Sequence, residues 1–202
     1  NTVTDSHHAL PIVKNSLEEI NKIELLPFKY LIDNGVKGAM VGHLYFPALE
    51  PVVNKSSSLS KNIVTDLLRN EMNYDGIIFT DGLEMKAAYN GIDPDSVCLQ
   101  AIMAGNDIML LPIDVEASMQ IVIDAAKNNP DVKNRVEESC KKILRYKYQL
   151  GLNNYESQSV ERLNNDLYQS RYYNLKQRLY NEAVTMLVNK KNILPLKKNS
   201  DK

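Results

Sequence analysis

Cysteine and histidine are scarce in this chain, which has two of the first and three of the second among its 202 residues. Cys98 and Cys140 are far apart in sequence and lie in helical patterns, so both are expected to be small buried apolar side chains. This usage excludes a disulfide framework. No group of histidines and cysteines has the spacing of a metal site, so we do not expect a bound metal.

The chain also lacks an excess of charge, a membrane-length apolar run and two familiar site signatures. Its net charge of −1 gives no electrostatic reason to expect nucleic acid or an anionic membrane as a partner. No apolar stretch is long enough to cross a bilayer. A glycine-rich phosphate loop and a G-x-S-x-G elbow are both missing. Nucleic-acid binding and a membrane span are therefore not expected.

Short apolar segments alternate with helical patterns along the first 150 residues. This order favours an α/β fold with a parallel sheet and right-handed crossovers. Three strands cannot close a barrel, which needs eight strands and about 250 residues. The pattern alone leaves open a small open sheet or one half of a barrel. The expected strands are residues 37–42, 77–80 and 107–111, and the expected helices are 24–34, 60–72, 93–104, 115–127 and 131–150.

The composition changes after Gly151, where residues 153–159 read as a polar linker. A helix rich in tyrosine and leucine is expected beyond it, and residues 192–196 read as the opening of a further domain. We therefore expect one domain over residues 1–152, and a linker with the start of a second domain over 153–202. The apolar positions of the expected helix are Tyr172, Leu175, Leu179, Ala183 and Leu187.

Asp81 directly follows the apolar run Ile77, Ile78 and Phe79, which reads as a strand buried on both faces. Catalytic groups of α/β folds lie just past the carboxyl ends of such strands. A carboxylate there is costly unless it is used, hydrogen-bonded or paired. The structural alternative is a helix N-cap, since aspartate is a favoured capping residue.

Two histidine-containing segments are the other candidates for chemistry. In Asp5-Ser6-His7, a carboxylate two residues before an imidazole could fix the ring tautomer and raise its basicity. From spacing alone, a solvated loop is the favoured interpretation of this pair. His43 ends its strand much as Asp81 ends its own, so it either lines the same pocket or is a buried structural histidine.

Four motifs together resemble the family 3 glycoside hydrolases, most closely the β-N-acetylglucosaminidase branch. They occur in the family's order and cover nearly the whole chain. Two further segments resemble the last barrel helix and the entry to the second, α/β sandwich domain. The motifs are NTVTDSHHALP (1–11), GHLYFPA (42–48), FTDGLEM (79–85) and AGNDIMLLP (104–112), and the further segments are KILRYK (142–147) with LGL (150–152), and 183–196.

The resemblance implies a retaining hydrolase that removes terminal β-linked N-acetylglucosamine, for example from peptidoglycan or chitin fragments. It implies that Asp81 is the nucleophile that forms the covalent glycosyl-enzyme. His7 is then the general acid/base, and Asp5 orients it. Ser6, His43 and Met85 are expected to contact the substrate. No metal or other cofactor is implied, and the partner is a carbohydrate.

The resemblance also implies that part of the family's pattern lies outside this chain. The Lys-His-Phe-Pro-Gly-His-Gly run that normally precedes the 1–11 motif is absent, and Gly82 stands where Ala or Asp is more usual. We expect residues 1–152 to be the second half of a (β/α)8 barrel, whose first half lies in the full-length protein. A bacterial protein of the cytoplasm or periplasm is expected. The alternatives are a β-glucosidase or glycoside phosphorylase on the same site, or a non-catalytic fragment.

Overall fold

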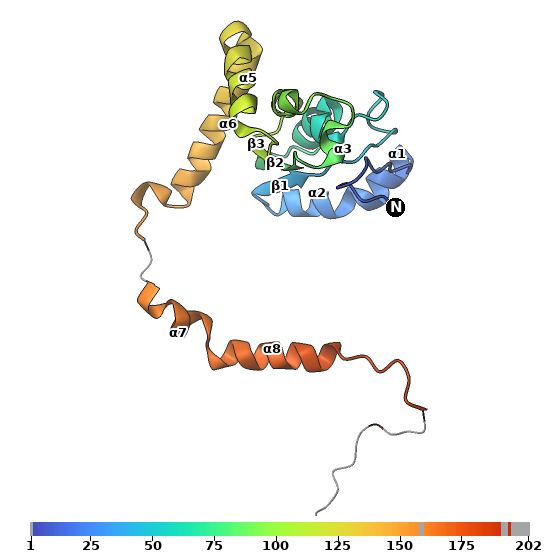
Figure 1. Cartoon of the computed structure of the whole chain (residues 1–202), viewed down its shortest axis with the longest axis vertical. Helices are drawn as coiled ribbons and strands as arrows, with labels where there is room; N and C mark the ends of the chain where they lie inside the picture. Colours follow the sequence, from blue (N-terminus) through green and yellow to red (C-terminus); the bar gives the residue numbers. More distant parts are fainter. Residues whose placement is uncertain (1, 158–159, 191–193, 195–202) are drawn as a thin grey trace, which may run out of the picture. The chain divides into compact units, whose positions relative to one another are not determined.

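The computed structural model describes residues 2–157, 160–190 and 194. The chain divides into two compact units, Asn1–Asn153 and Asn154–Lys202, which are described one at a time. The first unit contains the sheet and the helices around it (Figure 1).

Three parallel strands form the sheet of the first unit, in the order β1-β2-β3. Gly38 of β1 is level with Ile77 of β2, and Gly82 of β2 is level with Leu110 of β3. The expected α/β fold with a parallel sheet is confirmed. The carboxyl ends of all three strands therefore lie at one edge of the sheet. The strands are β1 (Gly38–Val41), β2 (Ile77–Gly82) and β3 (Ile108–Leu110).

The helices before and after β2 begin and end at residues suited to those positions. Ser60 Oγ accepts a hydrogen bond from Ile63 N (3.2 Å), as expected for a capping serine. Gly105 ends α4 with φ of +117°, and a Cβ there would meet Thr65 Oγ1 at 2.5 Å, so glycine is required. The elements are η2 (Ser57–Leu59), η3 (Asn62–Glu71), α3 (Lys86–Tyr89), η4 (Pro94–Ser96) and α4 (Val97–Ala104). The expected helix at 60–72 is wound with i to i+5 bonds.

Two helices follow β3 and pack side by side (Figure 1). Asp114 caps α5 (Val115–Asn128) by accepting from Ala117 N, and Asn129 caps α6 (Pro130–Gln149) by accepting from Asp131 N, both at 2.9 Å. The expected helices at 115–127 and 131–150 are thus confirmed.

The segment before β1 contains more helix than the sequence reasoning expected. α2 (Leu26–Asp33) was predicted, but α1 (Leu17–Glu19) and η1 (Ile20–Glu24) were not. Their start is a capping box: Glu19 N donates to Ser16 Oγ, and Ser16 N donates to Glu19 Oε2. A serine followed three residues later by glutamate is the sequence signal that announces such a start.

Two clusters of buried apolar side chains form the core of the first unit. One joins η2 to α4, and the other joins η3 to β2. Cys98 is buried in the first cluster, as expected, but Cys140 is exposed, so its expected burial is wrong. Cys140 lies on α6 where the helix lines a hollow of about 280 Å³ next to Met109. The clusters are Leu59, Leu83, Ala88, Val97, Cys98 and Ala101, and Val64, Tyr74, Ile78 and Ala104.

The second unit consists of short helical segments. The expected tyrosine-rich helix is α8, although Leu187 lies beyond its end. The predicted start of a further domain at 192–196 lies outside the described residues, except for Leu194. No helix in the described ranges has the length and apolar character of a membrane span. The segments are η6 (Val160–Arg162), α7 (Leu163–Leu167) and α8 (Ser170–Ala183), and η5 (Leu152–Asn154) spans the boundary between the two units in the sequence.

Candidate active site

Asp81 is the penultimate residue of β2, the central strand, and its side chain is half-buried. Its Oδ1 atom accepts a hydrogen bond from Gly82 N at 2.8 Å. Within residues 2–157, 160–190 and 194, no group donates to its Oδ2 atom. Asp81 caps no helix, because α3 begins five residues later, with Met85 at its N-cap. The Gly82 amide therefore binds one carboxylate oxygen of Asp81, and no described residue bonds the other.

Asp5 and His7 form a pair within an exposed loop. Asp5 Oδ1 accepts from His7 N at 2.9 Å and lies 2.7 Å from His7 Nδ1. Hydrogen bonds from the backbone and then the ring of His7 lower the pKa of Asp5. An ionised carboxylate only accepts hydrogen bonds, so the Nδ1 atom of His7 carries the proton that bonds Asp5, and Nε2 is the ring nitrogen that Asp5 does not contact. No described residue bonds that Nε2, and 69% of the His7 side chain is exposed.

The loop is tied to the carboxyl ends of two neighbouring strands. Ala87 N, in the helix after β2, donates to Ser6 O at 3.3 Å. On the other side, the chain pairs in parallel with Tyr45, just after β1: Tyr45 N donates to Pro11 O (2.8 Å) and Val13 N to Tyr45 O (2.9 Å). Asp81 and the Asp5–His7 pair therefore come to the same end of the sheet, although 74 residues separate His7 from Asp81 in the sequence.

Ser6 and Met85 lie at this end as well. The Ser6 carbonyl receives the bond from Ala87, which places Ser6 against the start of α3. Met85 is buried, and its backbone N donates to Gly82 O at 3.1 Å. The two residues thus border the loops that hold His7 and Asp81.

His43 is buried directly beneath the end of β2, with only 1% of its surface exposed. Its Nε2 atom lies 3.0 Å from Gly82 O, and its Nδ1 atom 2.8 Å from Ser58 Oγ. Burial lowers the pKa of His43, although the Gly82 carbonyl and the charge of Asp81 act in the opposite direction. Both ring nitrogens are thus engaged by protein groups, while the Asp81 carboxylate is close enough to affect the ring.

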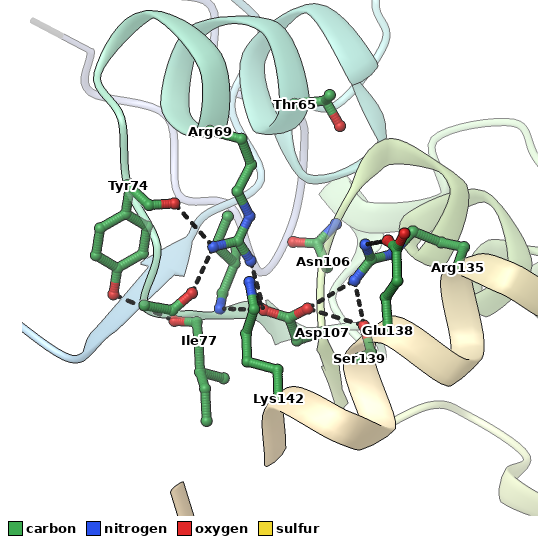
Figure 2. Close-up of polar contacts among 12 residues, drawn as sticks. Thr65, Arg69, Tyr74, Ile77, Asn106, Asp107, Arg135, Glu138, Ser139 and Lys142 are labelled. Carbon is green, nitrogen blue, oxygen red and sulfur yellow. Dashed lines mark hydrogen bonds and ion pairs between the residues drawn. The ribbon is translucent and has the colours of Figure 1, made fainter. Parts of the chain in front are cut away.

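Sequence reasoning missed a second polar cluster, which surrounds Asp107 at the start of β3. Figure 2 shows Asp107 reached by Arg69 from η3 and by Arg135, Ser139 and Lys142 from α6. The Asp107 side chain is fully buried. Its Oδ1 atom accepts from Arg135 Nη2 (2.7 Å) and Ser139 Oγ (2.8 Å), and its Oδ2 atom from Ile78 N (3.0 Å) and Arg69 Nη2.

The place of this cluster in the fold separates it from the candidate active site. Asp107 precedes β3 and bonds Ile78 near the start of β2, so it lies at the amino end of the strands. In α/β barrels, this end serves stability and the other end carries chemistry. The cluster therefore fastens helices to the sheet. The spacing of Arg135, Ser139 and Lys142, four and three residues apart, puts them on one helical face and is the signal that could have revealed it.

No three metal-ligating side chains are grouped together in the part of the chain that the structure describes. The site instead combines a carboxylate on the central strand with a carboxylate–histidine pair on a neighbouring loop. The Asp81 carboxylate could attack an acyl or glycosyl group, and the Asp5–His7 pair could supply a proton to the leaving group. The fold and site together define an α/β domain with a carboxylate and a carboxylate–histidine pair at the carboxyl end of a parallel sheet.

Comparison with known proteins gives the family. The family model described as glycosyl hydrolase family 3 N terminal domain matches residues 1–146, and the chain belongs to this family. The resemblance noted from the motifs is thereby confirmed.

Named relatives agree with the family assignment. Beta-hexosaminidase A of Pseudoalteromonas piscicida is 30% identical over 98% of this chain and 36% of its own length. A family 3 beta-N-acetylglucosaminidase structure from Paenibacillus sp. str. FPU-7 has a TM-score of 0.82 and 30% identity, over 93% of this chain and 36% of that chain. Beta-glucoside phosphorylase BglX shares the fold with a TM-score of 0.85 at 19% identity, over 96% and 37%. The chain spans little more than a third of the length of these proteins.

Proposed function

We propose that this chain contributes the catalytic residues of a retaining glycoside hydrolase that removes terminal β-linked N-acetylglucosamine. The single observation that supports this most is the arrangement at the carboxyl end of the sheet. There, a half-buried carboxylate, one of whose oxygens no described residue bonds, lies at the same end of the sheet as a histidine oriented by a second carboxylate. The named hexosaminidase relatives support the choice of sugar.

In the proposed first step, Asp81 Oδ2 attacks the anomeric carbon and the bond to the leaving oxygen breaks. The proton on His7 Nε2 passes to that oxygen as the glycosyl-enzyme ester forms. In the second step, water attacks the anomeric carbon, His7 Nε2 takes a proton from it, and the Asp81 carboxylate is released. This is the two-step course of retaining enzymes, with a histidine in the usual place of the carboxylic acid.

Asp5 is proposed to hold the ring of His7 in the tautomer that this exchange requires. Its low pKa keeps it ionised while His7 alternates between its two states. The imidazolium that exists before the first step and after the second is then stabilised by the neighbouring charge. Asp5 does not itself have to move a proton.

Ser6 and Met85 are proposed to border the sugar, because each lies beside a catalytic residue. That His43 contacts the sugar stays a prediction, and protein groups engage both of its ring nitrogens. The proposed substrates are N-acetylglucosamine-terminated fragments of peptidoglycan or chitin, and the proposed reaction uses no cofactor.

We further propose that residues 1–152 form the second half of a (β/α)8 barrel and that 153–202 lead into an α/β sandwich domain. Among the described residues, β1 and β3 are both edge strands. Met40 on β1 is 61% exposed and Phe28 on α2 is 53% exposed, and both line a largely apolar hollow of about 400 Å³. Further strands pairing with β1 would cover this surface.

Covalent trapping tests the proposal in the complete gene product that contains these residues. A slow fluorinated N-acetylglucosaminyl substrate should label the protein, and peptide mapping should place the label on Asp81. Asp81→Asn should abolish labelling while keeping the shape of the side chain. Asp66→Asn, which alters an exposed carboxylate paired with Lys61, is the matched control and should label normally. A label on another acidic residue would overturn the assignment.

The alternative activities are separated by one further assay. A panel of nitrophenyl glycosides is compared with and without phosphate. A preference for the N-acetylglucosaminide without phosphate dependence supports the proposed function. A preference for the glucoside, or formation of a sugar phosphate, supports the β-glucosidase or phosphorylase instead, and no turnover of any substrate supports a non-catalytic module.

A further inference from the structure

We propose that His43 is a positioning residue that acts on Asp81 through the backbone of Gly82. The inference rests on the proposed role of Asp81 as nucleophile. Gly82 connects the two side chains: its N–H donates to Asp81 Oδ1 at 2.8 Å, and its carbonyl accepts from His43 Nε2 at 3.0 Å. The Gly82 amide thus holds the Asp81 side chain, and His43 in turn holds Gly82.

The partners of His43 fix its tautomer. A backbone carbonyl only accepts hydrogen bonds, so Nε2 must carry a proton to bond Gly82 O. The buried ring is neutral, because burial lowers its pKa, and Nδ1 is therefore an acceptor. Ser58 Oγ, 2.8 Å away, donates to it. The ring is consequently held in one orientation by a donor on one side and an acceptor on the other.

A row of buried serines supports this arrangement. Ser56 Oγ lies 3.1 Å from Ser58 Oγ and 3.4 Å from His43 Nδ1, so a second hydroxyl stands beside the same ring nitrogen. Ser57 Oγ donates to Gly42 O at 2.7 Å and accepts from Leu44 N at 3.1 Å, so the backbone on both sides of His43 is bound as well. Connected hydrogen bonds in a buried site polarise and strengthen one another. The segment 56–58 therefore reads as a support for His43 rather than as a flexible loop.

Gly82 is the place where such a restraint has the most effect. A glycine has more backbone freedom than any other residue, and the amide that orients Asp81 belongs to it. A Cβ at Gly82 would find its nearest atoms at 3.7 Å, so crowding does not hold this backbone in place. Its pairing with Leu110 of β3 and two hydrogen bonds do so instead: His43 Nε2 and Met85 N both donate to the Gly82 carbonyl. Loss of the His43 bond would let the Gly82 amide, and with it Asp81, move away from its attacking position.

The test uses three variants of the complete gene product that contains these residues. His43→Leu removes the donor to Gly82 O, His43→Gln offers a replacement amide donor, and Ser58→Ala weakens the orientation of the ring while keeping it. A displacement of about 1 Å at a reacting atom can cost about 100-fold in rate. We expect His43→Leu to lower kcat for a nitrophenyl N-acetylglucosaminide by about 10- to 100-fold, with KM nearly unchanged. His43→Gln should recover most of this loss, and Ser58→Ala should show a smaller loss of the same kind.

A double-mutant comparison distinguishes positioning of the nucleophile from a general structural role. In an Asp81→Ala background, added azide replaces the nucleophile and reacts from solution. If His43 acts through Asp81, adding His43→Leu or Ser58→Ala to this background should leave the azide-dependent rate within about twofold. Near-UV circular dichroism of each variant corrects the rates for the folded fraction.

The outcomes are separable. An equal penalty in the native and the Asp81→Ala backgrounds, or a large rise in KM with kcat unchanged, would overturn the positioning role and indicate direct contact with the sugar or support of the whole site. Should His43→Leu not fold, Ser58→Ala in both backgrounds decides the question. Absence of turnover in the unaltered protein would contradict the proposed function itself and remove both inferences together.

Discussion

Replacement of Asp107 by asparagine should weaken the fold without disabling the site. Asp107→Asn keeps the size of the side chain but removes the negative charge that three cations share. Arg69, Arg135 and Lys142 lie within 4.0 Å of its two oxygens, and their side chains are only 14%, 21% and 17% exposed. The asparagine NH2 group would also face one of the present donors, where only an acceptor fits.

The expected magnitude follows from the burial of these groups. Removing one partner of a buried ion pair typically costs about 3–5 kcal/mol, because it leaves charge buried and uncompensated. The three cations retain partial contact with water, so we expect a loss near the lower end, about 3 kcal/mol. For a domain of 150–250 residues, this corresponds to a fall in Tm of roughly 6–12 °C.

Urea and thermal unfolding measure the loss, and hydrogen exchange locates it. The Ile78 amide should exchange faster in Asp107→Asn, because its acceptor is Asp107 Oδ2. Asp66→Asn, which breaks an exposed ion pair with Lys61, should cost less than about 1 kcal/mol. In the complete gene product that contains these residues, kcat measured well below the lowered Tm should stay within about twofold of the unaltered protein. A loss of stability below 1 kcal/mol, or a large fall in kcat in fully folded protein, would refute the reasoning.

Three further predictions concern the site and the chain. His7→Ala should slow substrates with poor leaving groups by about 100- to 10,000-fold more than nitrophenyl substrates, because general acid help matters least when the leaving group needs no proton; equal losses in steady-state assays would point to a positional role. In the unfolded chain, the imidazole of His43 takes up a proton below about pH 6.5, whereas burial lowers its pKa in the folded protein. The contribution of the neutral, buried ring to the free energy of unfolding is therefore complete above about pH 6.5 and is lost as the pH falls below it. His43→Gln should therefore flatten the fall in unfolding free energy between pH 7 and pH 5, and an unchanged slope would contradict the burial argument. Residues 1–202 expressed alone should show no hexosaminidase turnover and should associate through their open strand edges; a monomer that melts cooperatively and hydrolyses the nitrophenyl sugar would contradict both expectations.

The strands and most helices could be predicted from the sequence because their signals are local. The apolar run before Asp81 and the Gly105 stop after α4 identify their elements without tertiary information. The helical turns at 17–24 also had a local signal, the Ser16–Glu19 capping box, which was overlooked. The exposure of Cys140 could not be predicted from a local signal, because a helical pattern does not show which other segments pack against the helix.

The candidate site residues could be named from the sequence, but the contacts that connect them could not. Asp5 and His7 are close in sequence, so their pairing is a local matter. That the same loop would be fastened to Ala87 and Tyr45 depends on contacts between segments more than 30 residues apart. His43 likewise depends on tertiary contacts, because its partners Ser58 and Gly82 lie 15 and 39 residues away in the sequence. The position of His43 at the end of a strand does not determine whether its ring faces a bound sugar or lies beneath Asp81.

The two polar clusters bind the central strand at opposite ends and use different chemistry to do so. At the amino end, Asp107 accepts from Ile78 N, and a charged network joins the strand to two helices. At the carboxyl end, neutral groups hold Gly82 beside Asp81. Ile78 and Gly82 are four residues apart, or about 13 Å along a strand. Ion pairs are suited to the amino end of the sheet, where they add stability without altering the chemistry at the carboxyl end. Near Asp81, a further fixed charge would change the reactivity of the proposed nucleophile, whereas a neutral histidine restrains the backbone without adding a charge.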